Sequence, residues 1–396
     1  MERKKTIVRF IILVFVFYAA MGTFTPYLIP MGISRGYSQT AVTMIISVQM
    51  IFILLGNTLW GRMADRLQKN KMPFMLSLLL NGCVQALLFL VRQQTLYFTV
   101  FALFGLCCGT SGVLLDAWVL NEISFDISRF RKIRSAGAAG YAVTVLISGW
   151  IVENLGYGRS LILSLSLIVL TVLLSLSVRE SEKEIVHQTT SEKSKGLGFL
   201  KQPVYLAWVF LLVLSGMATN PIGTLKIVIL ERVGKGTSAL GVDSFIGCVA
   251  QFFLFFAAAK LEKLKPLSRM FLACTAITVG VLLYMFASSV YIIYIATMLF
   301  YGIYSIVNPG TREIIRDYIP PKDQTTAIGI ADACGLNIST MIAMLYTGLI
   351  SERYGIYALM VVCLGMSLLT VVISGALAFK ENRAQESHEI RERQYS

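Results

Sequence analysis

Apolar runs recur along nearly the whole chain, and short polar segments that carry most of the charge separate them. About 20 apolar residues is the length of an α-helix that crosses the hydrocarbon core of a bilayer. The pattern therefore predicts an all-α membrane protein with twelve transmembrane helices. Their predicted bounds are 7–31, 39–61, 72–92, 95–122, 133–153, 158–178, 203–228, 238–260, 266–287, 289–316, 324–351 and 355–379.

The longest polar interval, residues 179–202, lies between the sixth and seventh predicted spans. It divides the chain into a bundle of six helices at 1–178 and a second bundle of six helices at 203–379, with a tail at 380–396. The two halves also repeat, because Ser148–Gly156 aligns with Thr347–Gly355 at an offset of 199 residues. The sequence thus predicts two similar bundles joined by a cytoplasmic linker.

Composition supports this class, since 56% of the residues are hydrophobic and only 14% are charged, against about 25% in soluble domains. The net charge of +13 is a topology signal. If the N-terminus is cytoplasmic, 28 of the 35 Lys and Arg residues fall on cytoplasmic segments. We therefore expect a multi-pass protein of the cell membrane with both termini in the cytoplasm, and no nucleic-acid binding.

A short motif, Gly61-Arg-Met-Ala-Asp65-Arg66, follows the second predicted span. It resembles the GxxxD(R/K) loop motif of the major facilitator superfamily. That resemblance implies that Gly61 allows close helix approach and that Asp65, next to Arg66, accepts hydrogen bonds from a neighbouring helix end as a conformational latch. The alternative is an ordinary basic loop with one acid.

A more specific resemblance lies in the first, fourth and fifth spans, in Phe17–Tyr27, Leu114–Ala117 and Arg131–Tyr141. These segments are similar to lactose-permease-like sugar–proton symporters. In that family an acid and an arginine bind sugar hydroxyls, and an aromatic seven residues after the arginine stacks on the sugar ring. The resemblance assigns these roles to Asp116, Arg134 and Tyr141, and it adds Tyr18 of the first span. Asp in place of Glu and Tyr in place of Trp are departures from the family pattern, and they bear on which sugar fits and on whether a sugar fits.

The physical properties of these residues also suit sugar binding, independently of the resemblance. Asp116 lies in an apolar run, so a partner must offset its desolvation. Arg134 and Tyr141 are seven residues apart, two helical turns on one face. An acid, a guanidinium and an aromatic plane provide the hydrogen bonds and the apolar platform that a pyranose needs. The alternatives are a structural ion pair for Asp116, a charge at the cytoplasmic rim for Arg134 and plain packing for Tyr141.

The proton-carrying groups of those symporters are missing from the second half, where Cys248, Phe300 and Ile303 stand at the corresponding positions. The remaining candidates for proton coupling are Asp116 and Asp332, the latter flanked by apolar residues in the eleventh span. The alternative for Asp332 is an ion pair with a cation on a neighbouring helix. We expect no cofactor and no metal, with the proton gradient as the driving force.

Further candidates lie in the second half. Tyr301 and Asn308 stand at helical spacing in the tenth span and either line the solute cavity or pack. Pro221 predicts a break near the outer end of the seventh span, and Lys226 after it either pairs with Asp243 or extends outward to the interface.

These features favour a secondary active transporter that moves a small polar solute, such as a sugar, an oligosaccharide or a nucleoside, by proton symport with alternating access. A proton-coupled drug or metabolite exporter of the same fold is the main alternative. An enzyme is disfavoured, since no paired nucleophile and base or histidine cluster is present. The expected partners are the solute and the lipid bilayer, and the resemblance implies a monomer.

Overall fold

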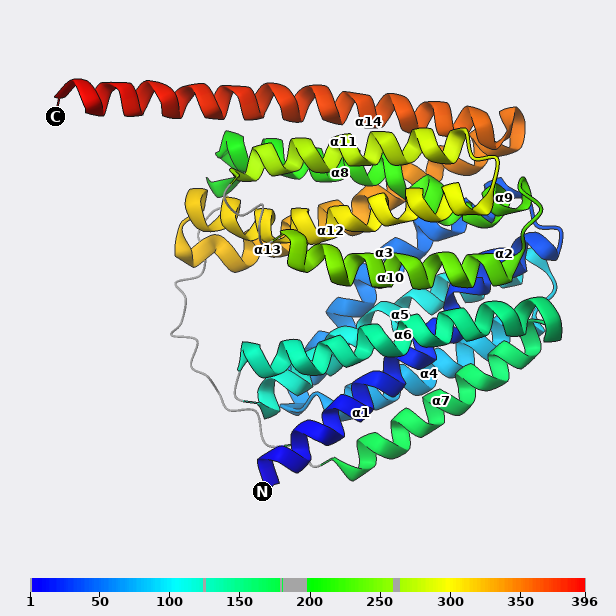
Figure 1. Cartoon of the computed structure of the whole chain (residues 1–396). Helices are drawn as coiled ribbons and strands as arrows, with labels where there is room; N and C mark the ends of the chain where they lie inside the picture. The colour runs from blue at the N-terminus through cyan, green and yellow to red at the C-terminus, as the bar shows by residue number, and fades with distance from the viewer. Residues whose placement is uncertain (1, 124–125, 179, 181–197, 259–263, 396) are drawn as a thin grey trace. The chain divides into compact units, whose positions relative to one another are not determined.

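The computed structural model describes residues 2–123, 126–178, 180, 198–258 and 264–395 (Figure 1). Most of the predicted linker, and the end of the span predicted at 238–260, lie outside the described residues. The regular elements of the described chain are helices. This is the expected outcome for apolar segments of this length, because a helix satisfies its backbone hydrogen bonds internally.

The helices of the first half follow one another with short connections (Figure 1). They are α1 (Glu2–Thr23), the 3-10 turn η1 (Thr25–Tyr27), α2 (Leu28–Ser34), α3 (Gln39–Leu67), α4 (Lys71–Leu90), α5 (Gln94–Glu122), α6 (Ile127–Leu155) and α7 (Tyr157–Ser177).

The second half has the same plan with more interruptions. Its elements are η2 (Gly198–Lys201), α8 (Pro203–Thr224), α9 (Lys226–Glu231), α10 (Thr237–Ala258), α11 (Pro266–Met285), α12 (Val290–Tyr318), η4 (Pro321–Asp323), α13 (Gln324–Asp332), the π-helical segment η5 (Ala333–Ile338) and α14 (Ser339–Tyr395).

Eleven segments of the described chain are long and apolar enough to cross a membrane. The last of them, Thr326–Glu381, is 56 residues long and contains Gly355, whose φ of 85° is not helical. That glycine separates two membrane-length pieces, so the predicted number of twelve is consistent with the structure. Gly156, its partner in the sequence repeat, has a φ of 82° at the junction of α6 and α7.

The chain divides into two compact units. Unit 1 comprises Met1–Thr189 and Gly234–Phe245, and unit 2 comprises Thr190–Val233 and Ile246–Ser396. The candidate residues on α1, α5 and α6 belong to unit 1, and those on α12 and α13 belong to unit 2.

Local sequence explains where several helices begin and end. Ser38 caps α3 by accepting a hydrogen bond from the Ala41 N–H, and Asp126 caps α6 by accepting one from the Arg129 N–H. Pro203 and Pro266 stand at the starts of α8 and α11, where a missing N–H costs no helical hydrogen bond.

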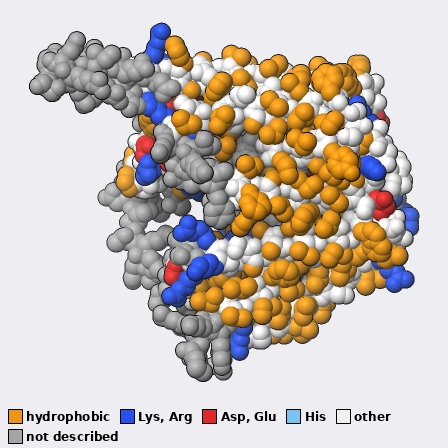
Figure 2. All heavy atoms as spheres, viewed as in Figure 1, with side chains coloured by type: hydrophobic (Ala, Val, Ile, Leu, Met, Phe, Trp, Pro, Cys, Tyr) orange, Lys and Arg blue, Asp and Glu red, His pale blue; other side chains and the backbone are white. Residues whose placement is uncertain are grey.

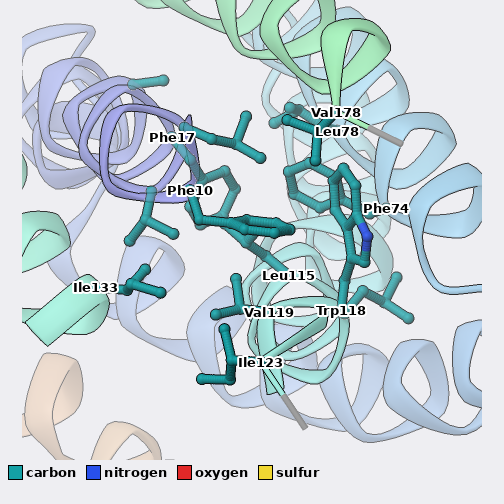
Figure 3. Packing of buried hydrophobic residues seen from close by; sticks show 14 of the residues in the cluster. Phe10, Phe17, Phe74, Leu78, Leu115, Trp118, Val119, Ile123, Ile133 and Val178 are labelled. Carbon is teal, nitrogen blue, oxygen red and sulfur yellow. The ribbon is translucent and has the colours of Figure 1, made fainter. Parts of the chain in front are cut away.

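Aromatic side chains from three helices, α1, α4 and α5, fill the core of unit 1 (Figure 3). Phe10 of α1 packs edge-on against Trp118 of α5, with ring centroids 5.3 Å apart, and Phe74 of α4 packs on both Trp118 and Phe17. Leu115 and Trp118 are fully buried. This packing fixes the face of α5 on which the intervening Asp116 can lie.

Hydrophobic side chains also cover the outside of the described helices, while Lys and Arg side chains gather near the helix ends (Figure 2). Leu90, Phe253 and Val372 are more than 60% exposed. An apolar exterior with charged ends is the pattern of a protein whose surrounding solvent is lipid.

Two predicted spans differ from the structure. The span predicted at 39–61 extends to Leu67, so Gly61–Arg66 forms the last turns of α3 instead of a loop. The span predicted at 7–31 is interrupted between α1 and α2, where Pro26 lies in the 3-10 turn η1. The break predicted near the outer end of the seventh span is confirmed: it occurs at Leu225, and Pro221 itself lies inside α8.

Candidate functional site

Three of the predicted site residues meet in unit 1. The Arg134 Nε of α6 lies 3.5 Å from the Asp116 Oδ2 of α5. The guanidinium carbon of Arg134 lies 4.0 Å from the centroid of the Tyr18 ring of α1. The structure therefore brings together an acid and a cation from the consecutive helices α5 and α6 and an aromatic plane from the distant helix α1.

Two glycines create the space for the Tyr18 ring. A methyl group at Gly137 of α6 would overlap Cδ2 of Tyr18, and one at Gly112 of α5 would lie 3.3 Å from its hydroxyl oxygen. Gly137 is three residues after Arg134, and Gly112 is four residues before Asp116, so each glycine lies one turn from a charged residue. The missing side chains allow the ring to enter between α5 and α6 and reach the guanidinium.

One oxygen of Asp116 has no donor. Oδ1 is buried and lacks a hydrogen-bond partner among the described residues, while Oδ2 faces Arg134. A buried acceptor without a donor costs roughly 1–3 kcal/mol. The site therefore has an open hydrogen-bonding position for a donor such as a hydroxyl group.

The pair nevertheless lies in accessible space, because the side chains of Arg134 and Asp116 are 40% and 31% exposed. Arg134 is five residues inside the span that begins at Arg129, and Asp116 is six residues before the end of α5. Charged side chains at such positions in membrane helices face water-filled or protein-lined space, since contact with lipid tails would be too costly. The cluster can thus line an aqueous cavity.

Tyr141 is the remaining predicted residue of this site. It lies on α6 two turns after Arg134, and its backbone packs against Gly22 of α1. The ring that stacks on the arginine is that of Tyr18. The expectation that Tyr141 stacks on a sugar ring stays a prediction.

The candidates in the tenth span lie on α12 in unit 2. The Tyr301 ring packs on Gly247 of α10, where an added methyl group would lie 2.6 Å from its Cε2 atom. This close packing favours a structural role for Tyr301. Asn308 is exposed.

Asp332, the candidate proton carrier, has a cationic neighbour. Its Oδ2 lies 3.8 Å from the Nη2 of Arg312 on α12, as the ion-pair alternative requires. Arg312 is one of the 28 Lys and Arg residues that the predicted topology places on cytoplasmic segments, so it was not identified as the partner of Asp332. Asp332 also stands directly before the π-helical segment η5, which sequence patterns did not indicate.

On the predicted topology, the residues of the gating motif lie at the cytoplasmic end of α3. Asp65 and Arg66 are exposed, and a side chain at Gly61 would meet no neighbour within 4 Å. Gly61 is therefore not a point of close helix approach in this conformation. The latch role of Asp65 stays a prediction.

A cavity of about 660 Å³ lies between α3 and α5, away from the charged cluster. Apolar residues make up most of its lining, and it shares none with the site at Asp116. Met44, Val48 and Leu103 on its rim are 40–42% exposed. It is an apolar groove of the outer surface of the unit.

The family described as "MFS_1 like family" matches residues 7–355, most of the chain. The chain belongs to the MFS_1-like family. It is a transporter of the major facilitator fold, and the superfamily resemblance drawn from Asp65 and its neighbours is confirmed.

Two curated relatives match at low identity. The uncharacterized transporter YwbF of Bacillus subtilis (strain 168) is 22% identical over 327 residues, 81% of this chain and 80% of that protein. A maltose permease of Geobacillus stearothermophilus is 22% identical over 377 residues, 94% of each chain.

Solved structures share the fold. The crystal structure of the nucleoside transporter NupG superposes with a TM-score of 0.79 at 16% identity, covering 95% of this chain and 99% of that one. A bacterial homolog of the human lysosomal transporter Spinster, in an inward-facing and occupied conformation, gives a TM-score of 0.68 at 12% identity, covering 96% and 97%. The predicted fold class is confirmed.

Proposed function

We propose that this transporter binds a small hydroxyl-bearing solute, a sugar, an oligosaccharide or a nucleoside, at Asp116, Arg134 and Tyr18, and moves it by proton symport. The observation that carries the proposal is the buried Asp116 Oδ1 without a donor, beside a guanidinium stacked on a ring. Such a site offers an acceptor, a donor fork and an aromatic surface. A sugar or a ribose, with hydroxyl groups on one side of its ring and C–H groups on the other, fits that set.

The relatives are consistent with this solute class, because one is named a maltose permease and a fold neighbour a nucleoside transporter. We further propose that the protein acts as a monomer with both termini in the cytoplasm. Asp116 and Asp332 are the proposed proton carriers, because both are carboxyl groups inside membrane-spanning helices.

A thermal-shift measurement tests the solute class. Purified protein is heated with maltose, with uridine, and with buffer alone, because a ligand that binds only the folded state raises the apparent melting temperature. A ligand that stabilises the protein is then tested for uptake into proteoliposomes under an acid-outside gradient. Stabilisation and gradient-driven uptake of either compound support the proposal.

Efflux of an apolar compound is the alternative, and the apolar cavity between α3 and α5 favours it. That cavity lacks any of the charged residues of the site. Proteoliposomes that export a lipophilic cation under a proton gradient, and that neither bind nor take up maltose or uridine, would contradict the symport proposal and support efflux.

A further inference from the structure

The two halves carry ion pairs at equivalent positions with opposite polarity. Asp116 and Arg312 are each the twenty-third residue of a 29-residue helix, α5 and α12 respectively. Each therefore lies six residues before the end of its helix. The same helix position thus holds an acid in unit 1 and an arginine in unit 2.

The second members of the pairs are also equivalent. Arg134 precedes Gly156 by 22 residues, and Asp332 precedes Gly355 by 23. The π-helical segment η5, which lies between Asp332 and Gly355, accounts for the difference, because a π-helical turn holds one more residue than an α-helical turn. The matching stretch of α6 is a continuous α-helix. Asp332 is therefore the register equivalent of Arg134.

The Arg312 guanidinium donates no hydrogen bond to Asp332. Their 3.8 Å separation is too long for a hydrogen bond, and Arg312 makes no hydrogen bond to any other described residue. Its side chain is 53% exposed although it lies within the span Val290–Tyr318. An arginine in a membrane helix with its donors unused must face water or a ligand.

A structural ion pair in the same unit looks different. The Arg269 side chain of α11 is 3% exposed and donates a hydrogen bond to Glu313, the residue after Arg312. Arg269 is thus buried against its acid, whereas Arg312 is exposed beside its own acid. In its exposure Arg312 resembles the accessible Arg134 of unit 1.

We infer that Arg312 is a solute-binding residue of unit 2, where its guanidinium fork donates hydrogen bonds to hydroxyl oxygens of a neutral sugar or nucleoside. Asp332 neutralises the arginine and holds it in place without occupying its donors. This inference rests on the proposed function, because it assigns a contact in unit 2 to the same solute class. It adds a binding residue with a role distinct from that of Asp332.

Substitutions at Arg312 and at Asp332 separate solute binding from ion pairing. Arg312→Lys keeps the charge beside Asp332 but removes the planar fork, so we expect about 10- to 150-fold weaker binding of whichever of maltose or uridine stabilises the wild type. Asp332→Asn leaves the planar fork of Arg312 in place and should weaken this affinity less than Arg312→Lys does. Arg316→Gln is the matched control, because Arg316 lies one turn further on α12 and pairs with the adjacent Asp317. Its affinity should equal that of the wild type.

A double variant covers the case in which Arg312→Lys does not fold. Arg312→Gln with Asp332→Asn removes both charges, so neither is left unpaired in the membrane. A solute-binding role for Arg312 predicts weak binding in the double variant, whereas a purely structural pair predicts wild-type affinity once both charges are gone.

The outcomes distinguish the two proposals. Wild-type affinity in Arg312→Lys, with binding lost in Arg134→Lys, would overturn the role of Arg312 and leave the proposed function intact. Failure of the wild type to bind either maltose or uridine would overturn both.

Discussion

The guanidinium carbon of Arg134 lies 4.0 Å from the centre of the Tyr18 ring, so a cation from α6 rests on an aromatic plane from α1. The same arginine lies 3.5 Å from Asp116 of α5. Cation–π attraction and the ion pair together orient the guanidinium, and the bare backbone at Gly137 lets the ring come this close. Most predictions for unit 1 follow from this arrangement.

Replacing Tyr18 tests whether the ring matters more than its hydroxyl. Tyr18→Ala removes the plane under Arg134 and should weaken solute binding about 2- to 30-fold, since a cation–π contact contributes about 0.5–2 kcal/mol. Tyr18→Phe keeps the ring and should bind within about 2-fold of the wild type. Tyr291→Ala on α12, 73% exposed, is the control for loss of a tyrosine. Equal affinities for Tyr18→Ala and wild type would show that the ring does not position the arginine.

Gly137→Ala tests the space in which the ring lies. Alanine favours a helix by about 1 kcal/mol over glycine, so a harmful effect must be steric. The new methyl group would overlap Tyr18 and also lie 3.0 Å from Val14, which should displace the ring and weaken binding. Gly365→Ala in α14 is the matched control, because no atom lies within 4 Å of its added methyl group. Unchanged binding in Gly137→Ala would contradict the packing described for Tyr18.

The latch role of Asp65 predicts a change in conformational equilibrium rather than in the solute site. Asp65→Asn removes a charge-assisted acceptor and should alter the transport rate more than the affinity. Labelling of single cysteines from each side of the membrane measures the equilibrium directly. Asp317→Asn, another exposed acid near a helix end, is the control. If labelling from the two sides is the same in Asp65→Asn and wild type, Asp65 is not a latch.

The buried position of Lys226 predicts that replacing it destabilises unit 2. Its side chain is 6% exposed, which excludes the alternative that it extends outward, and its Nζ donates to Thr297 Oγ1 at 3.1 Å beside the Tyr284 ring. Lys226→Met should lower the free energy of unfolding by about 1.5–3 kcal/mol, the value of a hydrogen bond to a charged group. Lys201→Met, at an exposed lysine, should change the melting temperature little. A melting temperature for Lys226→Met equal to that of the control would show that the buried lysine does not stabilise the unit.

The parts of the fold that sequence could predict depend on one-dimensional signals. Spans such as α5, predicted at 95–122 and observed at Gln94–Glu122, follow from apolar length alone. The need of Asp116 for a partner followed from the cost of a charge in lipid, and Arg134 supplies that partner. Span length and the desolvation cost of Asp116 depend only on single residues and their neighbours in the chain.

The missed features depend on three-dimensional neighbours or on small changes of helical register. Arg312 was interpreted as a cytoplasmic topology charge, because its distance from Asp332 is set by two helices that lie side by side. The π-helical segment after Asp332 leaves the apolar pattern unbroken, since it adds only one residue to a turn. The stacking of Tyr18 on Arg134 was not predicted, because it depends on the room that Gly137 and Gly112 leave beside the ring.

The central claim is that the Arg134 fork binds the solute, and Arg134→Lys tests it most directly. Lysine keeps the positive charge beside Asp116 but lacks the planar fork. The measurement is the affinity of the purified variant for whichever of maltose or uridine stabilises the wild type, with expression and melting temperature as controls. The account predicts about 10- to 150-fold weaker binding with unchanged folding. Wild-type affinity in Arg134→Lys would contradict the solute site at Asp116, Arg134 and Tyr18.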